Sequence, residues 1–426
     1  MPEVRADAVE RILAPLDLPS FLGTYWERSP LHVERDEATR FATLLSVARL
    51  ERLLANVELR FPDVQLARAD DPVAVEDYTD EDDRIVPLRL ARLHASGATL
   101  VVAGADRHVD ELGELCRELR AALGMRCQAN AYLSPPASRG FGPHHDSHDV
   151  IILQVEGRKT FRFHAGGPEL PLARDRFDRA RDQAGAIGEE ITLAPGDTLY
   201  IPRGVMHDAL ASASEKSLHV TLGLYPLTVL DVLHETLDLA ASREISLRRS
   251  VGGPRLSRPR VGERAGDGGA RDGGEDAGQG VGPDTGHGEF AGDAVLLDLG
   301  PLLERVFSAA GVDDALARLR DDVAIGSRPA GQGLLSDDPD AAEPTLDDWI
   351  APAESAPRRA ERRDGRLVLS LPGQVLEFRE PAASAVEALL RAGRLRVGDL
   401  PGPDDERRLA LARRLLRERV ATTVHP

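Results

Sequence analysis

Hydrophobic and polar residues alternate with two different periods along this chain. From Met1 to about Asn56 apolar residues recur at helical spacing, most clearly in TLLSVARLERLLAN, where they fall at i, i+3 and i+4. Between about Asn130 and Leu224, short apolar stretches alternate with Pro-Gly-Asp and Glu-Gly-Arg turn signals. Short strands in this rhythm are typical of an antiparallel barrel or jelly roll. The sequence therefore predicts an α+β chain with an antiparallel β core.

The remaining segments extend this picture in both directions. Between the two regions lie a predicted strand, GATLVV, a predicted helix, RHVDELGELCRELRAAL, and a second strand, RCQANAYLSP. After Tyr225 a helical pattern leads into a Gly-, Asp- and Arg-rich stretch, residues 252–292, which can bury almost nothing and is expected to be disordered. Helical periodicity then resumes. The last segment predicts strands GRLVLSL and QVLEFRE followed by two helices, a small unit of the winged-helix kind.

Composition excludes several classes of protein. At 426 residues the chain is long enough for two or three domains. It has no apolar run near the length of a membrane span and a charged N-terminus, so we expect a soluble, cytoplasmic protein without a membrane partner. Two cysteines exclude a disulfide framework and a cysteine-rich metal site. A net charge of −18 argues against direct nucleic-acid binding and favours a basic partner.

Three residues have the spacing of a metal site. His144 and Asp146 form an H-x-D pair, and residues two apart in a strand project to the same face, so both can reach one ion. PGDTLYIPRGVMH fits the second cupin motif, G-x5-P-x-G-x2-H, at every spaced position and ends at His207. Two histidines and one carboxylate with open positions opposite them are the ligands of non-haem Fe(II) oxygenases. An H-x-D pair alone is commonly just solvated, and the second motif is what favours the metal.

Other histidines compete for this role. His145 is out of phase with the pair and His148 lies beyond it, so we expect both to be solvated or to support the ligands from outside. His219 and Thr221 share a face of the predicted strand SLHVTLGL that can look into the barrel. A core histidine with its hydrogen bonds satisfied is the favoured reading of His219.

Lysine is rare in this chain, which makes its position informative. Lys159 and Lys216 are the only two. Lys159 shares the inward face of the predicted strand KTFRF with Phe161 and Phe163. A buried ammonium needs a carboxylate, and 2-oxoglutarate carries a distal one once its keto-acid end chelates iron. The alternative is a lysine that snorkels out at the barrel rim.

These motifs resemble the JmjC-type ribosomal oxygenases, cupin 2-oxoglutarate enzymes that hydroxylate ribosomal proteins. The resemblance rests on NAYLSPPASRGFGPHHDSHDVIILQVEGRKTFRF, PGDTLYIPRGVMHDALASASEKSLHVTLGL and, near the start, FLGTYWERSPLHV. It implies a double-stranded β-helix core and iron held by the three residues above, which would be both the metal ligands and the catalytic centre. It further implies that Lys159 binds 2-oxoglutarate and that Asn130 and Tyr132 line the pocket beside Thr221.

The resemblance also implies a domain organisation. Residues 1–225 would form the JmjC/cupin catalytic domain, with the barrel core at about 126–225. Residues 226–345 would form a helical dimerisation region interrupted by the insertion, and residues 346–426 a winged-helix-like domain. We therefore expect a homodimer.

Three functions remain open at this level. The first is an Fe(II)-, 2-oxoglutarate- and O2-dependent hydroxylase acting on Arg or His of a basic, ribosomal protein. The second is a JmjC-type N-demethylase or a peptide-modifying hydroxylase with the same chemistry. The third is a non-enzymatic cupin module, which would have no need of an inward lysine.

Overall fold

The computed structural model describes residues 7–248, 304, 306–325, 343–353, 359–363, 365–371, 374–418 and 420–424. The predicted disordered insertion at 252–292 lies outside these residues. The chain divides into two compact units, one of Met1–Leu227 with Arg318–Pro426 and one of Thr228–Ala317. Within the described residues no helix is long and apolar enough to cross a membrane.

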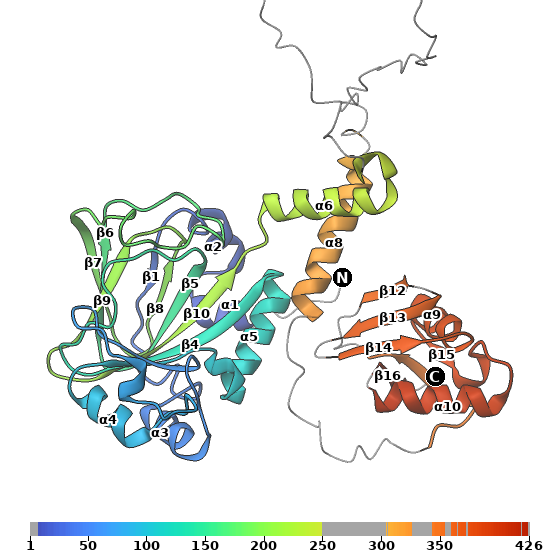
Figure 1. Cartoon of the computed structure of the whole chain (residues 1–426), viewed down its shortest axis with the longest axis horizontal. Helices are drawn as coiled ribbons and strands as arrows, with labels where there is room; N and C mark the ends of the chain where they lie inside the picture. Colours follow the sequence, from blue (N-terminus) through green and yellow to red (C-terminus); the bar gives the residue numbers. More distant parts are fainter. Residues whose placement is uncertain are drawn as a thin grey trace, which may run out of the picture. The chain divides into compact units, whose positions relative to one another are not determined.

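Residues 7–227 combine helices with two antiparallel sheets (Figure 1). The helices are α1 (Asp7–Leu13), α2 (Leu18–Thr24), α3 (Val47–Asn56), η1 (Val75–Asp77), α4 (Pro87–Ala95), η2 (Ala105–Arg107) and α5 (Asp110–Leu123). The strands are β1 (Leu31–Val33), β2 (Val64–Ala67), β3 (Thr99–Val102), β4 (Arg126–Ser134), β5 (Asp149–Glu156), β6 (Lys159–His164), β7 (Ile187–Leu193), β8 (Thr198–Ile201), β9 (His207–Ala211) and β10 (Ser217–Tyr225).

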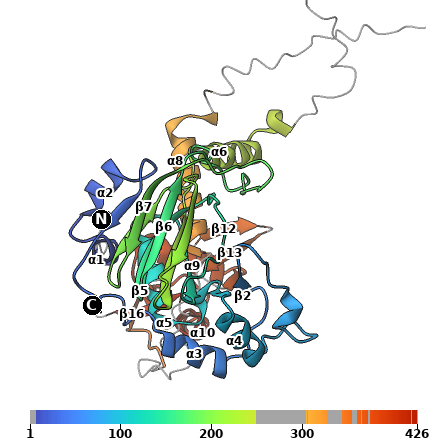
Figure 2. The same cartoon turned by 90° about the vertical axis from the view of Figure 1, so that its left-hand side faces the viewer.

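A seven-stranded sheet faces a three-stranded one. The large sheet has the order β1-β8-β5-β10-β4-β3-β2, and the small sheet has the order β7-β6-β9. Figures 1 and 2 show the small sheet on one side of the large sheet and helix α5 on the other. The predicted mixture of helices with an antiparallel β core is thereby confirmed.

Strand β5 is buried on both faces, which explains its unbroken run of apolar residues. Val150 and Ile152 pack with the small sheet, in a cluster that includes Phe161. Ile151 and Leu153 belong to the main core, which includes residues of the helices. Alternating side chains of one strand thus hold a layer together on each side.

Polar residues alternate with apolar ones in β10, which neighbours β5, and in β4, the next strand of the sheet. In β4 and β10 one set of alternate residues joins the helix-side core, and the other set faces the small sheet. The second set includes Asn130 and Tyr132 on β4, which lie directly opposite Thr221 and His219 on β10. Period-two alternation therefore gathers polar side chains between the two sheets.

The turn between β5 and β6 sets the direction of β6. Gly157 has φ +62°, and a Cβ there would lie 1.9 Å from the carbonyl oxygen of Lys216, so only glycine fits. After this turn β6 alternates strictly between buried and half-buried residues, starting with buried Lys159. The prediction that Lys159 shares the inward face with Phe161 and Phe163 is confirmed.

The second unit contains helix α6 (Val229–Arg243), η3 (Ile245–Arg248) and most of α8 (Ala309–Ile325). The capping box of Thr228 and Asp231 fixes the start of α6. The expected role of this region in dimerisation remains a prediction.

The C-terminal segment has a hydrophobic core of its own. Its elements are β11 (Trp349–Pro352), β12 (Arg359–Arg363), β13 (Arg366–Leu371), β14 (Gln374–Phe378), α9 (Ala382–Ala392), β15 (Leu395–Arg396), η5 (Val397–Asp399), α10 (Asp405–Arg417) and β16 (Ala421–Val424). They include two three-stranded sheets, β15-β11-β16 and β12-β13-β14. The predicted strands and helices lie where the pattern placed them, while the winged-helix assignment stays a prediction.

Candidate metal centre

Two segments far apart in the sequence bring the three candidate ligands together. His144 and His207 form an isolated antiparallel bridge, with N–O distances of 2.9 and 2.8 Å between their backbones. The carbonyl oxygen of Asp146 accepts a hydrogen bond from the amide of Gly204 at 2.9 Å. The expectation that the H-x-D pair lies in a strand is wrong, because only His144 pairs and β5 begins at Asp149.

The donor atoms of these three side chains converge. One ligand atom each from His144, Asp146 and His207 lies within 4.8 Å of the others. Both imidazoles contact a backbone carbonyl oxygen through Nδ1 at 2.9 Å, that of Gly142 for His144 and that of Val205 for His207. Because a carbonyl oxygen can only accept a hydrogen bond, each Nδ1 carries the proton and donates, which leaves the lone pair of each Nε2 free for an ion.

The electrostatic surroundings keep the three groups in the form that binds metal. Burial lowers the pKa of His207 to about 4, and His144 acts in the same direction. Burial alone would raise the pKa of Asp146, but the neighbouring imidazoles, first among them His144, bring that pKa below its ordinary value. Neutral imidazole at His207 and ionised carboxylate at Asp146 therefore coexist at neutral pH, as a metal requires of its ligands.

The turn before His207 is fixed on both sides. Gly204 has φ +86°, and a Cβ there would lie 2.0 Å from the carbonyl oxygen of Pro168. Arg203 contacts the fully buried carboxylate of Asp149 at 3.0 Å and pairs with Glu27 as well. The glycine and the proline of the cupin motif thus shape a turn that a buried ion pair holds in place.

Lys159 lies between the two sheets, and its ammonium has few partners among the described residues. Its side chain is buried, and Nζ donates to Oγ of Ser134 at 2.9 Å, which in turn lies 3.0 Å from Oγ1 of Thr99. No ion pair joins Lys159 to a carboxylate among the described residues, and burial lowers the pKa of Lys159 to about 7. Sequence reasoning missed Ser134, although it continues the period-two series of Asn130 and Tyr132 on β4.

The pocket-lining residues proposed from the sequence, Asn130, Tyr132 and Thr221, lie with His219 on the paired strands β4 and β10 of the large sheet. His219 is buried and stacks on Tyr132, with ring centroids 4.9 Å apart. Its Nδ1 has no hydrogen-bond partner among the described residues, so the expected satisfied core histidine is wrong. Burial, and then Lys159, hold the pKa of His219 well below its ordinary value. Asn130 accepts from the amide of Gly104 at 2.9 Å, which gives it a structural task as well.

Of two further histidines, His145 is buried and His148 is half-buried. His145 is buried, and its Nε2 lies 3.1 Å from a carboxylate oxygen of Asp182 in the loop between β6 and β7. His148 stacks on Tyr225 with ring centroids 4.6 Å apart. Of the two expected roles, support from outside the ligand set fits both residues better than exposure to solvent.

Two phenylalanines beside His144 were not foreseen. The ring of Phe141 lies 5.9 Å from that of His144, and the ring of Phe177 lies 6.3 Å from it in an edge-on arrangement. Phe177 is the lone aromatic residue in the charged stretch ARDRFDRARD, and this contrast was the available signal.

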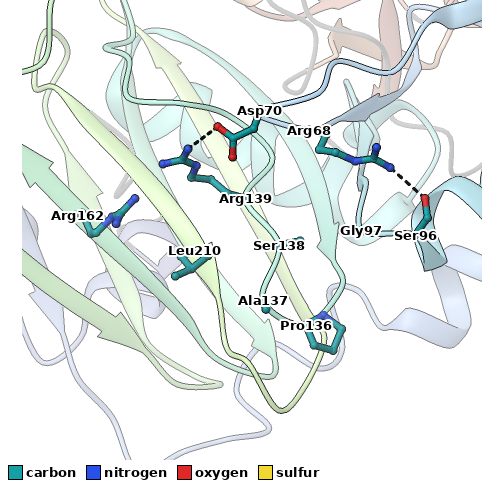
Figure 3. A pocket seen from close by; sticks show the side chains of 10 residues that line it. All are labelled: Arg68, Asp70, Ser96, Gly97, Pro136, Ala137, Ser138, Arg139, Arg162 and Leu210. Carbon is teal, nitrogen blue, oxygen red and sulfur yellow. Dashed lines mark hydrogen bonds and ion pairs between the residues drawn. The ribbon is translucent and has the colours of Figure 1, made fainter.

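A separate pocket of about 440 Å³ lies at the small sheet (Figure 3). It is lined by Arg68, Asp70, Ser96, Gly97, Pro136, Ala137, Ser138, Arg139, Arg162 and Leu210. Arg162 and Leu210 alternate with the inward residues of β6 and β9, so they point away from the metal ligands. Its arginines are already paired, for example Arg139 with Asp70 at 2.8 Å. The lining contains no candidate metal ligand and not Lys159, so this pocket is distinct from the metal centre.

A known protein family and several curated proteins resemble this chain in sequence. Residues 107–232 match the family described as the JmjC domain. The chain is 28% identical over 264 residues to the bifunctional lysine-specific demethylase and histidyl-hydroxylase NO66 of Drosophila persimilis, covering 59% of this chain and 38% of that protein. The same protein of Drosophila grimshawi is 31% identical over 230 residues, covering 51% of this chain and 31% of that protein. The chain thus spans well under half the length of these curated relatives.

Solved structures provide a second comparison. Escherichia coli ycfD covers 96% of this chain and 98% of its own, with 16% identity and a TM-score of 0.47. The ribosomal oxygenase YcfD of Escherichia coli in complex with cobalt and 2-oxoglutarate covers 96% and 99%, with 17% identity and a TM-score of 0.44. The JmjC-domain match and the curated relatives together confirm the predicted resemblance to JmjC oxygenases.

Proposed function

We propose that this chain, a JmjC-domain protein by its match over residues 107–232, is an Fe(II)- and 2-oxoglutarate-dependent oxygenase that hydroxylates a protein side chain. The observation that carries the proposal is the convergence of His144, Asp146 and His207, with a buried lysine that has no carboxylate partner among the described residues on β6, the strand paired with that of His207. Each half would be weak evidence alone. Together they match an iron site with a cation available for a dicarboxylic co-substrate.

The donor set fits iron better than a structural metal. Two imidazole nitrogens and one carboxylate oxygen form the ligand set of non-haem Fe(II) oxygenases, whereas a closed zinc site takes four protein ligands. Within the described part of the chain the group of potential ligands consists of these three residues. When bound there, Fe(II) with 2-oxoglutarate supplies the activation of O2 for insertion of one oxygen atom into a C–H bond, with succinate and CO2 as the other products.

The protein's part in this chemistry is to orient the metal ligands and to pair a cation with the co-substrate carboxylate. The backbone carbonyls of Gly142 and Val205 fix the tautomers of the two histidines, so Nε2 of each is ready before the ion arrives. The ammonium of Lys159 uses one donor on Ser134 and keeps others for the distal carboxylate of the co-substrate.

His219 gives independent support for a polar ligand at this place. Its buried Nδ1 lacks a partner among the described residues, and such an orphaned atom is costly unless a ligand or water satisfies it. Tyr132 stacks on the same ring, and Thr221 lies opposite Asn130 in the β4–β10 pairing. We propose Lys159, Asn130, Tyr132 and Thr221 as the residues that line the co-substrate site.

The substrate is proposed as a basic protein, with Arg or His of a ribosomal protein as the target. The net charge of −18 favours a basic partner. Relatives whose names include histidyl-hydroxylase match 59% of this chain, and the JmjC-domain match at residues 107–232 contains the three candidate ligands. We further propose a cytoplasmic homodimer, with residues 226–345 as the dimerisation region and residues 346–426 as a winged-helix-like domain.

The test is product analysis. The protein is incubated with Fe(II), 2-oxoglutarate, O2 and a pool of ribosomal proteins, and succinate and modified peptides are measured by mass spectrometry. We expect succinate and one Arg or His heavier by one oxygen atom, both absent in His207→Ala. Succinate formation that is equal in wild type and His207→Ala would contradict the assignment.

N-demethylation is the second candidate, because the curated relatives carry both activities in their names. It uses the same metal and co-substrate, so the site does not separate the two. Adding a pool of peptides with methylated lysine to the same assay does, since demethylation releases formaldehyde and removes one carbon from the peptide.

A further inference from the structure

The loop between β6 and β7, residues 165–186, is fastened at its base. The backbone amide of Ala165 donates to the carbonyl of Ala186 at 2.9 Å, and that of Gly185 donates to Ala165 at 2.8 Å. Gly167 approaches the turn that carries His207 so closely that a Cβ would lie 2.2 Å from the carbonyl oxygen of Gly204. The base is therefore held against the metal-binding turn.

The far part of the same loop returns to the other metal-binding segment. Phe177 presents its ring edge-on to His145 at 5.5 Å and to His144 at 6.3 Å between ring centroids. Asp182 lies 3.1 Å from Nε2 of His145 and accepts from the amide of Asp178 at 2.8 Å. One hydrogen bond thus ties the loop to the residue between two candidate ligands.

A second aromatic residue stands on another side of His144. Phe141 has an exposed fraction of 45%, and its ring also lies 6.4 Å from that of Tyr132. Exposing a phenylalanine ring to water is unfavourable, and burying the ring against a ligand would remove that penalty. Aromatic rings attract apolar and flat cationic side chains through their faces and edges.

We propose that Phe177 is an access and substrate-positioning residue of the metal centre, held over His144 by the hydrogen bond between His145 and Asp182. With Phe141 it forms an aromatic mouth through which the target side chain reaches the metal. The loop opens by releasing Asp182 and closes on the bound substrate segment. The proposal rests on the proposed function, because it assigns the mouth to that same centre.

The hydrogen bond between Asp182 and His145 can break and re-form. His145 is buried and its Nδ1 has no partner among the described residues, so the contact of its Nε2 with Asp182 is the hydrogen bond that its ring makes there. Asp182 itself is half-buried and also pairs with exposed Arg181. A hydrogen bond to a carboxylate at a partly wet position is strong enough to hold a loop and weak enough to open.

The first experiment measures loop opening without metal or co-substrate. Arg174, Arg176, Arg179 and Arg181 are exposed and offer trypsin four sites in the loop. We expect cleavage there to be about tenfold faster in Asp182→Ala and His145→Ala, as loss of a charge-assisted hydrogen bond implies, with no further increase in the double variant. Additive effects of the two substitutions, or unchanged cleavage in both, would overturn the proposal that the hydrogen bond between His145 and Asp182 holds the loop closed.

Two variants serve as controls. Asp182→Asn keeps an acceptor for His145 and should be cleaved more slowly than Asp182→Ala. Asp175→Ala removes a contact within the loop, the one to the amide of Leu172 at 3.0 Å, and should leave the link to His145 in place.

The second experiment measures access with Co(II) alone. Phe177→Ala should accelerate entry of Co(II) and its exit to a chelator by the same factor, leaving the Kd unchanged, because a gate alters rates and not the ligands. A changed Kd, with unequal effects on the entry and exit rates of Co(II), would make Phe177 a structural support of His144. Unchanged rates would leave Phe177 no role in access. Either result would overturn the proposal. Failure of the wild type to bind Co(II) would instead count against the proposed function. The trypsin result would still decide whether the hydrogen bond between His145 and Asp182 holds the loop closed.

Discussion

Lys159 and His219 are both buried and interact electrostatically. Lys159 has no carboxylate partner and Nδ1 of His219 has no hydrogen-bond partner among the described residues. Burying an ammonium without a carboxylate is unfavourable, which is why the pKa of Lys159 falls to about 7. The position of Lys159 was predictable, because the alternation of KTFRF places it beside two phenylalanines. Its partner Ser134 was not, because the pairing depends on how the two sheets face each other.

Lys159→Ala should weaken 2-oxoglutarate binding by about 2–5 kcal/mol, because the distal carboxylate would be left unpaired in a dry pocket. Lys159→Arg should be milder, since it keeps the charge. Titration of 2-oxoglutarate into the Fe(II)-loaded variants without oxygen measures the effect. The matched control is Lys216→Ala, which changes the exposed other lysine and should bind like the wild type. Equal affinity in Lys159→Ala would place the carboxylate anchor elsewhere.

The affinity for 2-oxoglutarate should fall as the pH rises above about 7, the value to which burial lowers the pKa of Lys159. The free protein loses this proton near neutrality, whereas the bound carboxylate favours the ammonium and raises its pKa, so binding takes up a proton. Calorimetry in buffers of different ionisation enthalpy at pH 8 should detect that uptake. In Lys159→Arg the guanidinium stays charged throughout, and any remaining pH dependence there would belong to another group.

At the level of elements, strands β4, β5, β6 and β10 could be predicted because each carries a clear apolar pattern. The division into one sheet of seven strands and one of three could not, because non-local pairing decides it. The H-x-D pair illustrates the same limit. Its segment runs beside β9 through a single bridge, so local turns rather than strand alternation aim His144 and Asp146 at one point.

The contact between β5 and the turn after β8 should be among the most sensitive to mutation. Asp149 is fully buried and accepts hydrogen bonds from Tyr200 at 2.8 Å and from Arg203 at 3.0 Å. Asp149→Ala leaves a buried guanidinium with reduced pairing and should lower the free energy of unfolding by about 3–5 kcal/mol. Urea denaturation measures this. Glu189→Ala, on the exposed part of β7, should stay within about 0.5 kcal/mol of the wild type, and an equally small effect at Asp149 would show that the ion pair is dispensable.

For the whole molecule, composition and pattern identified the parts but not their arrangement. The helical start, the β core and the C-terminal unit of strands and helices are where the pattern placed them. The loop at 165–186 was not foreseen as a part of the site, because its sequence is charged and its importance comes from where Phe177 and Asp182 end up. Polar composition predicts a surface loop and says nothing of what that loop reaches.

Deletion of residues 252–292 should leave 2-oxoglutarate turnover and the thermal midpoint nearly unchanged. The expectation rests on composition alone, since a stretch rich in Gly, Asp and Arg offers no core and long insertions alter loop-closure entropy little. Turnover and thermal unfolding of the deleted and full chains are compared under identical conditions. Slow amide hydrogen exchange within the stretch would contradict the premise.

His144, Asp146 and His207 are proposed to hold Fe(II) with positions left open for a keto acid. The most direct measurement is the visible absorption of the anaerobic protein with Fe(II) and 2-oxoglutarate. The weak charge-transfer band of an iron-chelated keto acid should appear in the wild type and vanish in His144→Ala, Asp146→Ala and His207→Ala, while circular dichroism shows all three variants folded. A wild type that binds Fe(II) but gives no such band, or a band that survives in all three variants, would contradict the account.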